Sequence, residues 1–320
     1  MPWVVGIDEA GYGPNLGPLV QAAVALFLPD GDTAGWETLK PVVRRCHEKA
    51  DGRLLIDDSK KVYTRHGFEA LERTVLVLAP ISGDVAELVR KTTSVAGLDE
   101  VATELWFQGD ERLPLTASRE EWWAEFVRFG EQRELCGHRF YVHSDALIVP
   151  PLRFNGICDE SGSKATVLSR GLIQLINTVT ENLSLAVEPK LGSLAFLCDK
   201  HGGRNFYAGM LQEAFPTGWI MPERESADES RYRIEMLDRP VTITFRPRAD
   251  GDSVAVALAS MLCKYLREVC MRQFNRFWAT HVPGIQPTAG YPGDAKRFFD
   301  QIKPAMAKLG LTDDQVWRKK

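Results

Sequence analysis

The chain has 320 residues, of which 44% are hydrophobic, so it can bury a full core in one large domain or two small ones. This composition excludes a disordered protein, and no apolar run reaches the about eighteen residues that a membrane span needs. The formal net charge of −4 argues against a protein that coats nucleic acid by bulk electrostatics.

The first predicted strand is the most informative segment. Val4, Val5 and Ile7 have the β-branched character of a sheet interior. Asp8 and Glu9 follow them directly, and adjacent carboxylates repel each other unless cations neutralise them. The pair therefore indicates a site for hard divalent metal ions, with a plain surface turn as the alternative that this segment alone leaves open.

The following elements are predicted from apolar patterns and turn residues. Residues 19–28 predict a second strand that forms a hairpin with the first, and residues 36–49 predict a helix. Asp58 and Ser59 are suited to cap a further helix. Residues 74–81 then predict another strand.

The middle of the chain is less regular. Residues 91–150 predict an insertion or subdomain with a strand-like stretch at 140–152. A helix is predicted over 163–181, followed by an apolar strand that ends at Asp199 before a Gly-Gly turn.

The last third contains the clearest helical periodicity. Residues 253–278 predict a long helix with one buried face. A stretch rich in Pro and Gly then leads to a terminal helix over about 295–309.

The cysteines and the basic residues are each open to a structural interpretation. The cysteines form no CxxC pair and lie mostly among apolar neighbours, which favours reduced, buried thiols over disulfides or a zinc site. Short basic clusters, such as Lys60 with Lys61 and Lys264 with Arg267, suit either a local phosphate groove or a solvated surface. The six cysteines stand at positions 46, 136, 158, 198, 263 and 270.

Acidic residues recur at predicted strand ends and helix starts. Asp8 and Glu9 end one strand, Asp199 ends another, and Asp250 precedes the long helix. In open α/β sheets such positions meet at one edge, where three or four carboxylates can hold two Mg²⁺ or Mn²⁺ ions. Taken singly, Asp199 also suits a turn and Asp252 a helix cap.

Five sequence blocks, in order, resemble the type 2 ribonuclease H family. They cover most of the chain, although residues 91–190 show little similarity to it. The blocks read GIDEAGYGPNLGPLV, IDDSKKVY, FLCDKHGG, RADGDSVAVALASMLCKYLRE and AGYPGDAKRFF.

The resemblance implies an α/β, ribonuclease-H-like fold. It has a central mixed five-stranded sheet flanked by helices, with a large insertion and a helical C-terminal extension. In this chain it implies a catalytic core from residues 1–90 and 151–280. Residues 91–150 would be the insertion or subdomain, and residues 281–320 the extension with the Gly-Tyr-Pro block.

The resemblance also implies a metal-dependent endonuclease that cuts the RNA strand of RNA/DNA hybrids, or embedded ribonucleotides, with two Mg²⁺ or Mn²⁺ ions. Asp8 would be the bridging ligand. The family's fourth acid stands ten residues before the serine at position 260, which selects Asp250 and leaves Asp252 as a helix N-cap. The implied catalytic and metal-binding residues are Asp8, Glu9, Asp199 and Asp250.

Substrate contacts are implied in the same way. The glycine turn of the family usually reads Gly-Arg-Gly, whereas this chain has Gly11, Tyr12 and Gly13, so a cationic side chain is replaced by an aromatic one that can stack on a sugar or base. Tyr291 matches the family tyrosine that packs against deoxyribose. The remaining implied contacts, to phosphates, are Lys60 and Lys264.

Two other functions remain open. A nuclease with the same metal centre but another nucleic-acid substrate is motivated by Tyr12 and the long insertion. A non-catalytic nucleic-acid-binding relative is disfavoured, because clustered carboxylates repel phosphates unless cations compensate them. The N-terminus shows no signal-peptide pattern, so we expect a cytoplasmic protein with no membrane partner, and a monomer is favoured.

Overall fold

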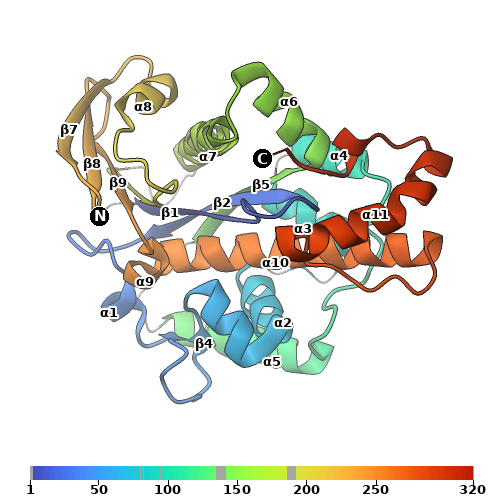
Figure 1. Cartoon of the computed structure of the whole chain (residues 1–320). Helices are drawn as coiled ribbons and strands as arrows, with labels where there is room; N and C mark the ends of the chain where they lie inside the picture. The colour runs from blue at the N-terminus through green and yellow to red at the C-terminus, as the bar shows by residue number, and fades with distance from the viewer. Residues whose placement is uncertain are drawn as a thin grey trace.

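One mixed β-sheet lies between two layers of helices in the computed structural model of the chain (Figure 1). The structure describes residues 3–79, 81, 83–93, 95–134, 142–185 and 192–319. The strand order is β5-β2-β1-β6-β9-β8-β7, and this architecture confirms the predicted α/β fold class. The strands are β1 (Trp3–Ala10), β2 (Leu19–Phe27), β5 (Val142–Val149), β6 (Leu194–Asp199), β7 (Trp219–Glu225), β8 (Ser230–Glu235) and β9 (Val241–Arg246), with β3 (Val43–Arg44) and β4 (Leu54–Leu55) forming a separate small sheet.

The central strands bring their carboxyl ends to one edge of the sheet. β1 pairs antiparallel with β2, which confirms the predicted hairpin, and parallel with β6. Ile7 lies opposite Cys198, and Asp199 lies opposite Arg246 of the parallel neighbour β9. The residues that follow β1, β6 and β9 therefore emerge side by side.

The sheet is larger than the five strands that were predicted. β8 pairs antiparallel with β9, and β7 pairs with β8, which adds two strands at one edge. No strand was predicted here, because the apolar run at the start of β7 is only three residues long and the rest of the strand is charged and exposed.

Part of the predicted insertion belongs to the central sheet. β5 lies within residues 91–150 and pairs antiparallel with the whole of β2, so Val149 lies opposite Leu19. The strand-like stretch was recognised, but its partner was not, because the pairing joins segments more than a hundred residues apart. The rest of the proposed division into core, insertion and extension stays a prediction.

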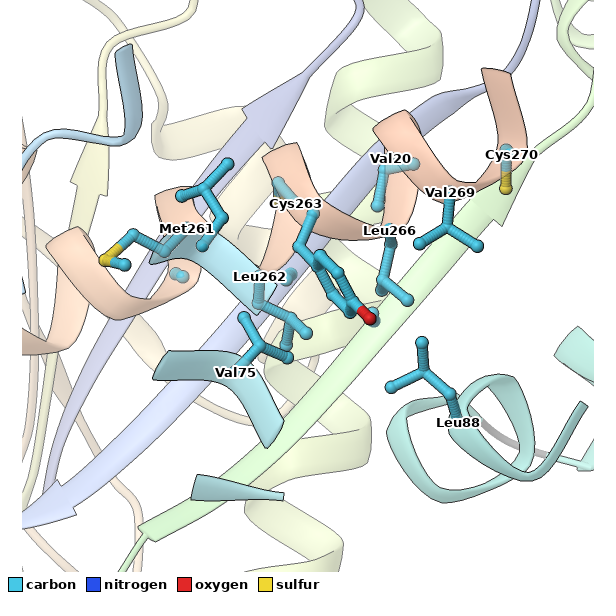
Figure 2. Packing of buried hydrophobic residues seen from close by; sticks show 14 of the residues in the cluster. Val20, Val75, Leu88, Met261, Leu262, Cys263, Leu266, Val269 and Cys270 are labelled. Carbon is cyan, nitrogen blue, oxygen red and sulfur yellow. The ribbon is translucent and has the colours of Figure 1, made fainter. Parts of the chain in front are cut away.

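Helices cover both faces of the sheet and create two cores. The long helix α10 packs along one face beneath β1 and β2, while α6 and α7 lie on the other (Figure 1). Figure 2 shows part of the first core, where side chains of α10 gather with Val20 of β2, Val75 of α2 and Leu88 of α3. The helices are α1 (Trp36–Leu39), α2 (Ser59–Leu78), α3 (Val85–Thr92), α4 (Val95–Ala102), α5 (Arg119–Arg133), α6 (Pro151–Ser161), α7 (Ala165–Leu185), α8 (Ala208–Ala214), α9 (Ala249–Asp252), α10 (Val254–His281) and α11 (Pro292–Leu309).

The long periodic segments were predicted correctly, and two shorter ones were wrong. The helices predicted over 163–181, 253–278 and 295–309 correspond to α7, α10 and α11. The helix predicted over 36–49 ends at Leu39, because Pro41 has no N–H to continue the helical hydrogen bonds and the next residues pair as β3.

The strand predicted over 74–81 is instead the second half of α2. That helix is kinked at Gly67, whose φ is 77°, and its C-terminal half is buried on most sides. A short apolar run bounded by Pro has the same pattern in a buried helix and in a buried strand, so periodicity alone does not separate them. Asp58 caps this helix as predicted, since its side chain accepts hydrogen bonds from the backbone N–H groups of Lys60 and Lys61.

The described cysteines are free thiols, as predicted. Cys198, Cys263 and Cys270 are buried, whereas Cys46 and Cys158 are partly exposed. Cys136 lies outside the described residues. Within the described ranges, no helix is both long enough and apolar enough to cross a membrane.

We expect Gly6→Ala to destabilise the protein by at least about 3 kcal/mol, because α10 packs directly on β1 at this position. A Cβ at Gly6 would lie 2.1 Å from the backbone carbon of Ala255. Urea unfolding measures the change. Gly156→Ala is the matched control, since nothing lies within 4 Å of a Cβ there and alanine is the better helix former, so we expect a gain of about 0.5–1 kcal/mol. Equal stabilities of the two variants would contradict this packing.

Candidate metal and nucleic-acid site

All ten residues that were predicted as site residues line one cavity of about 520 Å³. The cavity opens where β1, β6 and the segment after β9 end, and α2, α10 and α11 contribute the other walls. The ten residues are Asp8, Glu9, Gly11, Tyr12, Gly13, Lys60, Asp199, Asp250, Lys264 and Tyr291.

Asp8 and Glu9 form the acidic floor at the end of β1. The Asp8 carboxylate accepts a hydrogen bond from the backbone N–H of Glu9 at 2.8 Å. Burial raises the pKa of Asp8 to about 7, the hydrogen bond from Ser260 opposes that rise, and the charges of Asp199 and Asp250 add to it. Burial raises the pKa of Glu9 to about 8, with further contributions from the charges of Asp8 and Asp199.

Asp199 and Asp250 lie on the adjacent wall. Asp199 ends β6 and accepts a hydrogen bond from the backbone N–H of Ala249 at 3.2 Å, which ties it to the start of α9. Burial raises the pKa of Asp199, and backbone hydrogen bonds limit the rise. Burial also raises the pKa of Asp250, reinforced by the charges of Asp58 and Asp199. The carboxylates are thus close enough to repel one another.

Asp252 lies outside this cavity, and its predicted role as a helix cap is wrong. The N-cap of α10 is Ser253, and Asp252 is the last residue of the short helix α9. The Asp252 side chain is 59% exposed and lies 3.9 Å from Arg246. The turn of α9 therefore directs the two acids to different sides, with only Asp250 in the cavity.

The chemistry of this donor set fits a hard divalent cation. The four carboxylates supply only oxygen ligands, which Mg²⁺ and Mn²⁺ prefer, and Lys60 is the cation that opposes the charge of both Glu9 and Asp199. Over the described residues, however, no group of three or more His, Cys, Asp or Glu side chains is arranged to hold a metal ion. The carboxylates surround the cavity without converging on one point.

The two predicted phosphate-binding lysines are in different states. Lys60 is exposed in the first turn of α2 at the mouth of the cavity. Lys264 also lines the cavity, but its ammonium donates to Glu268 at 2.6 Å and lies 4.5 Å from the centre of the Tyr63 ring. To contact a phosphate, the Lys264 ammonium must either break its hydrogen bond to Glu268 or bind both groups at once.

The glycine turn follows the acids at the end of β1 and lines the same cavity. Gly11 has a φ of +88°, and a Cβ there would lie 2.4 Å from Nε of Arg267, so both conformation and space require glycine. The Tyr12 ring is half-buried against the second core, and the ammonium of Lys164 lies 4.4 Å from its centre. A cation thus accompanies the aromatic residue at the centre of the turn.

Tyr291 joins the turn through the Gly-Tyr-Pro block. The carbonyl of Gly290 accepts hydrogen bonds from the backbone N–H groups of Asn15 at 2.8 Å and Leu16 at 3.2 Å. Tyr291 itself is 52% exposed at the start of α11, so its ring is accessible to a ligand in the cavity.

Sequence reasoning missed several residues of the cavity wall. The Ser260 hydroxyl of α10 is hydrogen-bonded to the Ser59 hydroxyl at 2.9 Å and to Asp8, and Arg267 lies under Gly11. The available signal was helical spacing, because Ser260, Lys264 and Arg267 lie four and three residues apart on one face of α10. The lining residues that were not among the predicted site residues are Ala10, Asp58, Ser59, Arg248, Ser260 and Arg267.

Comparison with known proteins gives structural neighbours only. No protein-family model and no curated protein matches the sequence. Among solved structures, ribonuclease H2 from Pyrococcus horikoshii is 13% identical with a TM-score of 0.49, over 98% of this chain and 92% of that one. Ribonuclease HII from Archaeoglobus fulgidus, solved with PCNA, is 14% identical with a TM-score of 0.42, over 99% and 93%.

A third neighbour, Bst-RNase HIII solved with Mn²⁺, is 15% identical with a TM-score of 0.45, over 99% of this chain and 66% of that one. These structures represent the ribonucleases that the sequence blocks resemble. Because the TM-scores are below 0.5, the structural similarity does not support any particular reaction for this chain. A proposed reaction rests on the residues of this chain alone.

The acidic floor predicts how stability depends on pH. The pKa values of Asp8 and Glu9 lie above those of an unfolded chain, so the folded state binds more protons and its stability falls as the pH rises through about 7 to 8. In metal-free buffer we expect the free energy of unfolding to fall by at least about 1 kcal/mol over that range. Added Mg²⁺ should restore it by binding the ionised carboxylates.

The matched variants for this experiment are Glu9→Gln and Glu213→Gln. Glu9→Gln removes one of the two titrating groups and should flatten the curve. Glu213 is exposed and does not line the cavity, so its variant should follow the wild type. Parallel curves for Glu9→Gln and the wild type in denaturant titrations would contradict this electrostatic account.

Proposed function

We propose that the chain is a metal-dependent endonuclease that hydrolyses the RNA strand of RNA/DNA hybrids or cuts at ribonucleotides embedded in DNA. The observation that carries the proposal is the single cavity lined by four acids, two lysines, the glycine turn and Tyr291. These residues come from five sequence blocks that resemble type 2 ribonucleases H.

The acids would hold two Mg²⁺ or Mn²⁺ ions, with Asp8 as the bridging ligand. When bound, the ions supply an activated water for in-line attack on the phosphodiester and stabilise the leaving 3′-oxygen. The role of the chain is to keep Asp8 and Glu9 fixed on a sheet strand and Asp199 anchored to the backbone of Ala249.

The other walls would bind and orient the nucleic acid. The exposed ammonium of Lys60 would bind a phosphate at the mouth of the cavity. Gly11 and Gly13 leave the backbone of the turn open to close approach, because a Cβ on Gly13 would meet only the Tyr291 ring at 3.9 Å. The exposed ring of Tyr291 provides a flat surface for a sugar at the same place.

A nuclease with a different nucleic-acid substrate is the second candidate, and the state of Tyr12 favours it. Its ring packs on the core with Lys164 over one face, which limits stacking to the remaining surface. A binder without catalysis is disfavoured because five acids line the cavity, Asp58 besides the four proposed ligands, and their uncompensated charge would repel phosphates.

We expect Asp8→Asn and Asp250→Asn each to reduce hydrolysis of a hybrid by about a thousandfold or more, because each removes an ionised ligand from the proposed metal site. Asp252→Asn is the matched control, since this acid stands two residues away and outside the cavity, and we expect its rate to stay within about twofold of wild type. Initial rates with saturating Mg²⁺ or Mn²⁺ provide the measurement. If Asp252→Asn were inactive and Asp250→Asn active, the assignment of the fourth acid would be wrong.

The substrate is tested with matched duplexes of RNA/DNA, DNA with one ribonucleotide, DNA alone and RNA alone. We expect cleavage of the first or the second, and none of DNA alone. Cleavage confined to DNA or to RNA would replace the proposed substrate with the second candidate. Binding without cleavage under every divalent metal would favour the non-catalytic binder.

A further inference from the structure

Residues 316–319 pass directly beneath the segment that follows the glycine turn. The backbone N–H of Arg318 donates to the carbonyl of Asn15 at 2.8 Å, and the side-chain amide of Asn15 donates back to the Arg318 carbonyl at 3.1 Å. Leu16 and Trp317 form an antiparallel bridge beside them. The C-terminal end accordingly returns to the middle of the molecule, near α6 and the sheet (Figure 1). Two segments about 300 residues apart in the chain thus act as a main-chain clamp.

The Arg318 side chain extends this clamp to both ends of the turn. It is 1% exposed, and its Nη2 donates to the carbonyl of Gly11 at 2.6 Å and also to the carbonyl of Pro14. These two carbonyls flank Tyr12 and Gly13, so one guanidinium fixes the spacing across the part of the turn that faces the cavity. The guanidinium also packs over the Phe154 ring, 4.8 Å from its centre.

The guanidinium of Arg318 has no acidic partner among the described residues. Its Nε and Nη1 are buried, and neither donates a hydrogen bond to any of the described residues. Burial lowers the pKa of Arg318 to about 9, and the positive charge of Arg267 contributes to that change. Removing a charge from water without an ion pair is costly, and the hydrogen bonds to the carbonyls of Gly11 and Pro14 offset part of that cost.

Arg267 adds a second positive charge beneath the same turn. It is 2% exposed, its Nη2 donates to the carbonyl of Ala289 at 2.9 Å, and its closest carboxylate contact, to Glu268, is 4.0 Å. Its Nε lies where a Cβ on Gly11 would be. Charges in a low-dielectric interior are poorly screened, so both guanidinium groups contribute positive potential at the wall of the cavity that the turn forms.

We propose that Arg318 is a positioning residue for nucleic-acid binding: it holds the Gly11–Pro14 turn in the shape presented to a phosphodiester strand and, with Arg267, makes that wall positive. This inference rests on the proposed function. The central side chain of the turn, Tyr12, is uncharged. The proposal explains why two buried arginines without a close carboxylate partner lie beneath this turn. Arg318 reaches the substrate only through the turn, because it does not line the cavity.

The test compares Arg318→Met, Arg318→Lys and the control Lys319→Met in steady-state cleavage of an RNA/DNA hybrid. Met fills the space over Phe154 but leaves the carbonyls of Gly11 and Pro14 without their donor. Lys keeps the charge and one donor. Lys319 stands next to it, with an exposed ammonium paired to Asp159, and lies outside the cavity.

For Arg318→Met we expect KM to rise at least tenfold with kcat within about twofold of wild type. Arg318→Lys should recover KM to within about threefold, and Lys319→Met should match the wild type. A lower melting temperature with unchanged KM in both Arg318 variants would overturn the proposal, because a merely structural role moves stability alone. Equal KM changes in Arg318→Met and Lys319→Met would overturn it as well.

Hydrogen exchange separates failure of this inference from failure of the proposed function. If the wild type cleaves no hybrid, the proposed function is wrong, but the clamp is still measured by exchange of the backbone amides of Tyr12 and Gly13. We expect exchange at least tenfold faster in Arg318→Met than in Lys319→Met, since the turn loses its support. Equal exchange in these two variants would overturn the positioning role whatever the substrate is.

Discussion

The close approach of helix α10 to strand β1 is the constraint on which the site depends. Gly6 has no side chain, and a Cβ there would meet the backbone of Ala255 at 2.1 Å, so the helix packs directly on the strand that bears Asp8. Farther along the same contact, the Cys263 thiol donates to the Asp8 carbonyl at 3.2 Å. This register places Ser260, one turn away, against the Asp8 carboxylate. If a side chain at position 6 held α10 farther from β1, Ser260 would no longer lie against the Asp8 carboxylate.

Opposite charges are separated across the cavity rather than paired. The acids lie at the ends of β1 and β6 and in α9, where burial and mutual repulsion raise the pKa values of Asp8 and Glu9. Arg267 and Arg318 lie buried beneath the glycine turn, with unsatisfied nitrogen atoms and no close carboxylate among the described residues. Direct ion pairs between the two groups would cancel both fields. Their separation leaves one wall suited to cations and the other suited to phosphates.

Much of this arrangement was predictable from local patterns, and the errors share one cause. The strands that carry Asp8 and Asp199 and the long helix α10 show clear periodicity, so their ends were located correctly. The run 74–81 was wrong because a buried helix and a buried strand have the same apolar pattern. The hairpin of β7 and β8 was missed because β7 is mostly charged and exposed after a short apolar start, and the buried face of β8 includes a serine. In each case the local pattern did not decide the structure, whereas packing against the rest of the chain did.

By itself, the sequence determined which side chains are available and where they stand on their elements: carboxylates at strand ends, glycines in the turn, one lysine at a helix start and one on a helix face. Only the tertiary structure decided which of them share a cavity, that Asp250 enters it while Asp252 does not, and that Arg318 supports the turn at Gly11. The physical reason is the separation along the chain over which each interaction acts. Periodicity and capping act over a few residues, whereas a contact between residues 11 and 318 depends on how every intervening element packs, and it leaves no local pattern to read.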